Sequence, residues 1–91
     1  MTNVIEVRYW AAAKSAAGTP SDRFEVDGPL TLAEVVRRAA ELHPDTRLPE
    51  VLKVCSALIG DRPVGSQDPS AVEVEPGATV EFLPPFAGGS E

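Results

Sequence analysis

The stretch Thr31-Leu32-Ala33-Glu34-Val35-Val36-Arg37-Arg38-Ala39-Ala40-Glu41-Leu42 decides the fold of this chain. It opens with a capping box, in which Thr31 accepts from the Glu34 amide and the Glu34 carboxylate reaches back to the Thr31 amide. Apolar side chains then recur at helical spacing, at positions 32, 35, 36, 39 and 42, and charged side chains take the opposite face. The pattern predicts a helix over residues 32–42 with one stripe against a sheet, ended by Pro44.

Two strands are expected on the amino-terminal side of this helix. Residues 4–10 place Ile5, Val7 and Tyr9 on one face and charged side chains on the other, which is typical of a half-buried strand. The alanine-rich residues 11–17 predict a short helix that ends at Gly18. Residues 23–26 alternate again and predict a second strand, antiparallel to the first.

Two further strands are expected on the carboxyl-terminal side. Residues 45–50 are interpreted as a polar connection, and residues 51–53 as either a turn of helix or the entry to a strand. The apolar run 54–59 has the length of a strand, and residues 62–64 form a return after a Gly-Asp turn. Residues 71–74 are compatible with extended chain or a short strand. Pro76-Gly77 predicts a type II turn before a last strand at 78–83.

This order of elements predicts one α+β domain over residues 1–83, a mixed sheet packed on one main helix. The helix between the second and third strands is the kind of crossover that permits parallel neighbours. Residues 84–91 are expected to form a flexible, extended tail that carries the function.

Composition excludes several classes of protein. The chain has 91 residues with 43% hydrophobic and 24% charged side chains, which is a globular composition of one-domain length. Its net charge is -6, and the sequence after residue 60 contains six acidic residues and one basic residue. Because a protein that binds phosphates needs a basic surface, no nucleic-acid partner is expected. We find no signal peptide and no apolar run of membrane-spanning length, and we expect a cytoplasmic protein with no membrane partner.

Few residues offer chemistry of their own. The single histidine, His43, precedes a proline at a helix end and is interpreted as an exposed capping residue rather than a general base. The single cysteine, Cys55, lies in an apolar run and is interpreted as a small buried hydrophobe. One cysteine and one histidine cannot make a Cys/His zinc site, so no metal is expected.

The carboxyl end is the distinctive segment, and it reads Leu83-Pro84-Pro85-Phe86-Ala87-Gly88-Gly89-Ser90-Glu91. Two prolines restrict it to extended conformations and carry no amide donors, so we expect the tail neither to fold back nor to pair with the sheet. A strand followed by Pro-Pro, a hydrophobic residue, a small residue and Gly-Gly resembles the ubiquitin-like β-grasp sulfur carriers. The likeness is greatest to the small subunit of molybdopterin synthase.

The resemblance implies a mechanism centred on Gly89. An adenylating, E1-like enzyme would use ATP to activate the Gly89 carboxylate, and sulfur from a sulfurtransferase would replace AMP. The resulting thiocarboxylate would donate sulfur to a precursor held by the large catalytic subunit of molybdopterin synthase. Phe86 and Ala87 would be read inside the partner's channel, where Gly88 and Gly89 lack the Cβ that would obstruct it. The carrier itself is expected to be no enzyme and to bind no cofactor.

Two points stay open at this stage. The family pattern ends at the second glycine, whereas Ser90-Glu91 follow here, so we expect a processing peptidase to release the Gly89 carboxylate. Related carriers serve thiamin or cysteine biosynthesis or modify proteins. A β-grasp interaction module with an inert tail is the alternative from another class of function.

Overall fold

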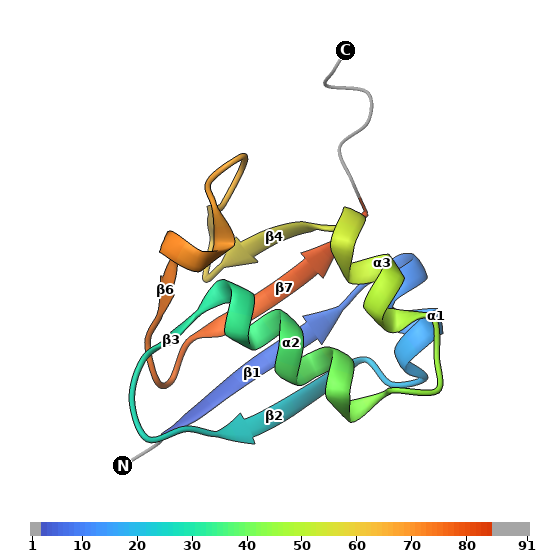
Figure 1. Cartoon of the computed structure of the whole chain (residues 1–91), viewed down its shortest axis with the longest axis horizontal. Coiled ribbons are helices and arrows are strands. Elements are labelled where there is room, and N and C mark those ends of the chain that lie inside the picture. Colours follow the sequence, from blue (N-terminus) through green and yellow to red (C-terminus); the bar gives the residue numbers. More distant parts are fainter. Residues whose placement is uncertain (1–2, 85–91) are drawn as a thin grey trace.

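Residues 3–84 are described by the structure, a computed structural model. Five strands form a mixed sheet in the order β2-β1-β7-β4-β5, and β3 and β6 form a second, two-stranded sheet (Figure 1). The strands are β1 (Val4–Tyr9), β2 (Ser21–Glu25), β3 (Leu30–Thr31), β4 (Ser56–Ile59), β5 (Arg62–Pro63), β6 (Glu73–Val74) and β7 (Thr79–Leu83). The helices of the described residues are α1 (Ala11–Ala17), α2 (Leu32–Leu42), α3 (Leu48–Val54) and the 3₁₀ turn η1 (Pro69–Ala71). The predicted α+β architecture with a mixed sheet is confirmed.

The first and last strands are the parallel pair of the sheet. β1 lies beside β7, with Val7 opposite Val80 and Tyr9 opposite Phe82. β2 pairs antiparallel with β1, as predicted, and β4 pairs antiparallel with β7. β2 and β4, the strands of the five-stranded sheet that precede and follow α2 in the sequence, are therefore not neighbours, because β1 and β7 lie between them. The hydrophobic alternation fixes which face of a strand is buried, and it does not specify the partner strand.

One core lies between the sheet and the helices (Figure 1). The alternation predicted for the first and last strands is confirmed, since every second side chain on β1 and β7 is buried. All three helices contribute to the same core, α1 and α3 as well as the expected α2. Its largest fully buried side chains are Tyr9, Phe82, Ile5, Leu48, Val7, Val35, Val74 and Val80.

The capping box of α2 is only half formed. Thr31 Oγ1 accepts from the Glu34 amide at 3.1 Å, as predicted, and α2 has the predicted bounds. The Glu34 carboxylate instead pairs with Arg37 and Arg38 on the next turn, because these guanidinium groups lie at i+3 and i+4. The apolar face of α2, expected to pack on the sheet as far as Leu42, is buried only as far as Ala39, and Leu42 is 49% exposed.

The segment after α2 was only partly predicted. Residues 45–50 are not all connection, since α3 begins at Leu48 with Pro49 in its first turn, a favoured place for proline. Leu48 and Leu52 are four residues apart, so they lie on the same face of α3, and both are buried in the core. β4 consequently begins at Ser56, and Val54, expected in the strand, is an exposed last residue of α3.

Candidate functional site

The site begins where β7 ends, at the base of the expected tail. β7 is the central strand of the sheet and is hydrogen-bonded on both sides, to β1 and β4 (Figure 1). Phe82 is 2% exposed and stacks on Tyr9, with ring centroids 6.3 Å apart. Leu83 is half-buried opposite Ser56, and Pro84 follows as an exposed residue without an amide donor. The tail therefore starts from a rigid anchor.

Trp10 lies beside this anchor. Its backbone amide donates to the Phe82 carbonyl at 3.1 Å, and its indole Nε1 donates to Glu81 Oε1 at 2.9 Å. The side chain is 44% exposed on the sheet face opposite the core. No sequence motif points to Trp10, although the alternation that buries Tyr9 places the next residue on the outer face.

Most of the predicted site residues lie outside the described part of the chain. Pro84 is described, whereas Pro85, Phe86, Ala87, Gly88 and Gly89 lie beyond it, as do Ser90 and Glu91. Their roles stay predictions. The described residues establish only where the segment begins, at the end of β7.

A side-chain cluster joins β1, β2 and the end of α2. Tyr9 Oη donates to Asp22 Oδ2 at 3.0 Å, and His43 Nε2 lies 2.6 Å from the same oxygen. Burial, and then the neighbouring Asp22 carboxylate, raise the pKa of Tyr9 well above its usual value. The tyrosine is therefore a neutral hydrogen-bond donor, and the cluster ties β1 and β2 to the end of α2.

His43 caps α2 as predicted, but the prediction that it is exposed was wrong. His43 is the C-cap residue of α2, but only 18% of its side chain is exposed, because the ring packs edge-on against Tyr9 and bonds Asp22. The sequence contains a pattern that indicates Asp22 as the partner of His43. Asp22 stands two residues before Phe24, so the alternation of β2 points its carboxylate toward the helix side.

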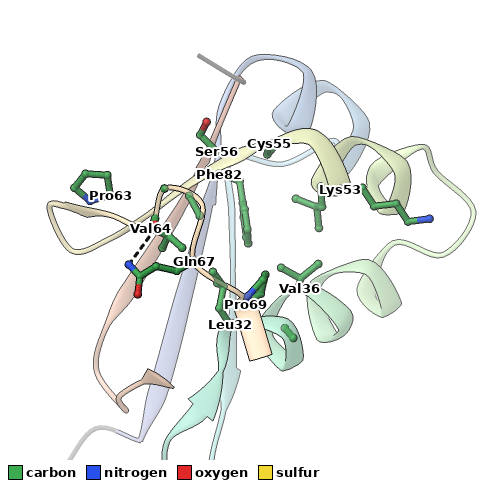
Figure 2. Close-up of a pocket in the computed structure, with 14 residues that line it drawn as sticks. Leu32, Val36, Lys53, Cys55, Ser56, Pro63, Val64, Gln67, Pro69 and Phe82 are labelled. Carbon is green, nitrogen blue, oxygen red and sulfur yellow. Dashed lines mark hydrogen bonds between the residues drawn. The ribbon is translucent and has the colours of Figure 1, made fainter. Parts of the chain in front are cut away.

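Cys55 lines a cavity instead of the interior of a strand. It is the C-cap residue of α3 and is half-buried at the edge of a cavity of about 420 Å³ between α2, α3, β4 and the loop after β5 (Figure 2). Burial raises the pKa of its thiol. A protonated thiol is a poor nucleophile, so this group is not an activated cysteine.

Between residues 3 and 84, no three His, Cys, Asp or Glu side chains gather where they could hold a metal ion. None of the helices in that range has the length and apolar character needed to cross a membrane.

Several solved structures share this fold. Small archaeal modifier protein 1 from Haloferax volcanii is 19% identical with a TM-score of 0.73, over 94% of this chain and 99% of that chain. The Haloferax volcanii HVO 2177 protein is 27% identical with a TM-score of 0.72, over 97% and 88%. A chain from the protein-protein complex of subunits 1 and 2 of the molybdopterin-converting factor of Helicobacter pylori 26695 is 22% identical with a TM-score of 0.62, over 91% and 95%.

The comparisons confirm the predicted ubiquitin-like β-grasp fold. None of the curated proteins matches the chain. The ThiS family matches residues 7–89, which is nearly the whole sequence and includes the Gly-Gly pair. The chain therefore belongs to the ThiS family of β-grasp sulfur carriers.

Proposed function

We propose that this carrier serves molybdopterin biosynthesis through a thiocarboxylate at Gly89. A peptidase removes Ser90-Glu91, and the freed carboxylate attacks the α-phosphate of ATP in an adenylating partner, releasing pyrophosphate. A sulfur nucleophile delivered by a sulfurtransferase then displaces AMP. The large subunit of molybdopterin synthase accepts the tail and supplies the catalysis, so the carrier contributes only the reacting group.

The observation that carries the proposal is the connection between β7 and the tail. β7 is fixed by hydrogen bonds on both sides, and Pro84 ends the sheet because it has no amide to donate. The six residues from Pro84 to Gly89 would span at most about 20 Å if fully extended, which is far enough to enter a partner's active site. The family match also stops at residue 89, which supports Gly89 as the working terminus.

The outer face of the sheet supports a protein partner at the base of the tail. Trp10 is 44% exposed there, and Leu58 and Leu83 are half-buried on the same face. Aromatic side chains are the commonest anchors of protein interfaces. In the related Helicobacter pylori protein, subunit 1 of a molybdopterin-converting factor is found in complex with subunit 2. We assign the same kind of partner, a large synthase subunit, to this face.

Protein modification is the second candidate. It is favoured by the fold shared with small archaeal modifier protein 1, which aligns over 94% of this chain. Both roles begin with adenylation of the same glycine, so they differ only in what attacks the activated carboxyl group. An amine of a target protein would give an isopeptide bond, whereas sulfur gives the thiocarboxylate.

Deletion of the gene in its own host tests the pathway. We expect loss of activity of molybdopterin-dependent enzymes, with growth without added thiamin or cysteine unchanged. A copy ending at Gly89 should restore the lost activity, and the same copy carrying Gly89→Ala should not. A requirement for thiamin or cysteine, or covalent adducts of the carrier on other proteins in place of the molybdopterin defect, would contradict the proposal.

A further inference from the structure

The cavity beside Cys55 has the dimensions and lining of a small-molecule site. Its volume is about 420 Å³, within the range of ~300–1,000 Å³ usual for such pockets. Figure 2 shows side chains from opposite walls converging on it, with Val36 on α2, Phe82 on β7, and Val64 and Gln67 in the segment after β4. The cavity lies on the helix side of the sheet, so it is separate from the outer face that carries Trp10.

The walls are mostly apolar. Leu32, Leu52, Val64 and Phe82 are buried and belong to the core, so the floor of the cavity is the core itself. The Gln67 side chain is held at the rim, where Nε2 donates to the Val64 carbonyl at 3.0 Å (Figure 2). Apolar walls favour a hydrocarbon group, because burying apolar surface is favourable by roughly 25 cal/mol per Å².

The residues that line the cavity include one basic side chain and no acidic one, although the protein as a whole is acidic. The protein carries 14 acidic and 8 basic side chains, yet no carboxylate is among the residues that line the cavity. The one permanently charged lining residue is Lys53, which is exposed at the rim and has no ion-pair partner among the described residues. Figure 2 shows its side chain extending away from the other lining residues. The nearby Asp68 carboxylate is engaged by the amide and hydroxyl of Ser70.

We propose that this cavity binds a small amphipathic carboxylate, such as a medium-chain fatty acid. The hydrocarbon chain lies between Val36 and Phe82, and the carboxylate stays at the solvent-exposed mouth. That position is required, because an ionised carboxylate cannot be buried without a partner. Lys53 can swing its four-carbon stem to reach the carboxylate there. The proposal does not involve the tail or Gly89, so it stands or falls independently of the sulfur-carrier function.

Cys55 provides a reporter for the test, because it is the single cysteine and lines the cavity. The rate at which a thiol reagent alkylates Cys55 in the full-length protein is measured at fixed pH with increasing decanoate. We expect saturable slowing of alkylation as the ligand covers the thiol. A rate that does not depend on decanoate would overturn the proposal.

Two variants and an uncharged ligand test whether Lys53 recognises the carboxylate of the ligand. Lys53→Gln should weaken protection by decanoate roughly three- to fivefold, the size of one exposed ion pair. Lys14→Gln, which removes the only other lysine, should leave protection unchanged. Decanol should protect the wild type less well than decanoate does, and equally in the wild type and Lys53→Gln. Equal protection by decanol and decanoate, or no effect of Lys53→Gln, would overturn the assignment of a carboxylate.

A substitution that fills the cavity gives an independent test of whether the ligand binds there. Val36→Phe adds volume from the half-buried wall of α2 and should abolish protection by decanoate. Circular dichroism establishes whether this variant is folded. If it is not, the comparison of Lys53→Gln with Lys14→Gln decides the matter, since both changes are at exposed positions.

Discussion

The indole Nε1 of Trp10 lies 2.9 Å from Glu81 Oε1, and this hydrogen bond joins the end of β1 to β7 two residues before the strand ends. Because the partners are exposed, we expect a coupling energy of about 0.5–1 kcal/mol. A double-mutant cycle measures it, with Trp10→Phe removing the N–H donor and Glu81→Val the acceptor. Urea denaturation followed by circular dichroism gives the four free energies of unfolding. Zero coupling would show that the contact does not hold the base of the tail.

Because the pKa of Tyr9 is raised, we expect the free energy of unfolding to change with pH in the alkaline range. The folded chain keeps the phenolic proton that the unfolded chain loses at about pH 10. The contribution of Tyr9 is therefore fully present below about pH 10 and falls as the pH rises above it. We expect the free energy of unfolding of Tyr9→Phe to fall less steeply than that of the wild type above this pH. Parallel curves for the two proteins would contradict the burial and bonding of this tyrosine.

A pair of valines tests which helix positions form the core. Val35 in α2 is 0% exposed, whereas Val54 at the end of α3 is 63% exposed. We expect Val35→Ala to destabilise the protein by about 1–3 kcal/mol through lost burial and a residual cavity. Val54→Ala should change stability by no more than about 0.5 kcal/mol. Equal effects of the two substitutions in thermal unfolding would contradict the packing described.

Ala11 carries backbone strain at the junction of β1 and α1. Its φ is +51°, in the left-handed region that disfavours residues with a Cβ by roughly 1–2 kcal/mol. Ala11→Gly relieves this strain and should raise the free energy of unfolding by about 0.5 kcal/mol, after the entropy of the unfolded chain is counted. Ala12→Gly, at the next exposed position of the same helix, should lower it by up to about 1 kcal/mol. The same sign for both variants would contradict the conformation at Ala11.

Local patterns in the sequence predicted the main elements well. The capping residue Thr31, the stripe of α2 and the alternation of β1 and β7 each depend on neighbours within one or two turns, and the structure confirms them. The turn before β7 is also as predicted, with Gly77 at φ +91° and the Ala78 amide bonded to the Glu75 carbonyl.

The errors fall where two local patterns compete or where a distant residue decides. Glu34 was expected to complete a capping box, but it pairs with two arginines on the next turn of α2. His43 was expected at the surface, but a partner 21 positions earlier in the sequence, Asp22, draws it against the core. Cys55 was placed inside a strand, because the two buried leucines of α3 were not recognised as a helical pair. The predicted tail residues from Pro85 onward lie outside the described residues, so their part of the site stays a prediction.

The most direct test of the sulfur-carrier account is the mass of a chain that ends at Gly89. It is incubated with the activating enzyme of its host, ATP and a sulfur donor, beside the chain that ends at Glu91. We predict that the shorter chain alone gains the mass difference of one oxygen replaced by one sulfur, and that Gly89→Ala prevents this gain without lowering the melting temperature. An unchanged mass for the shorter chain, with an enzyme proven active on another carrier, would contradict the account.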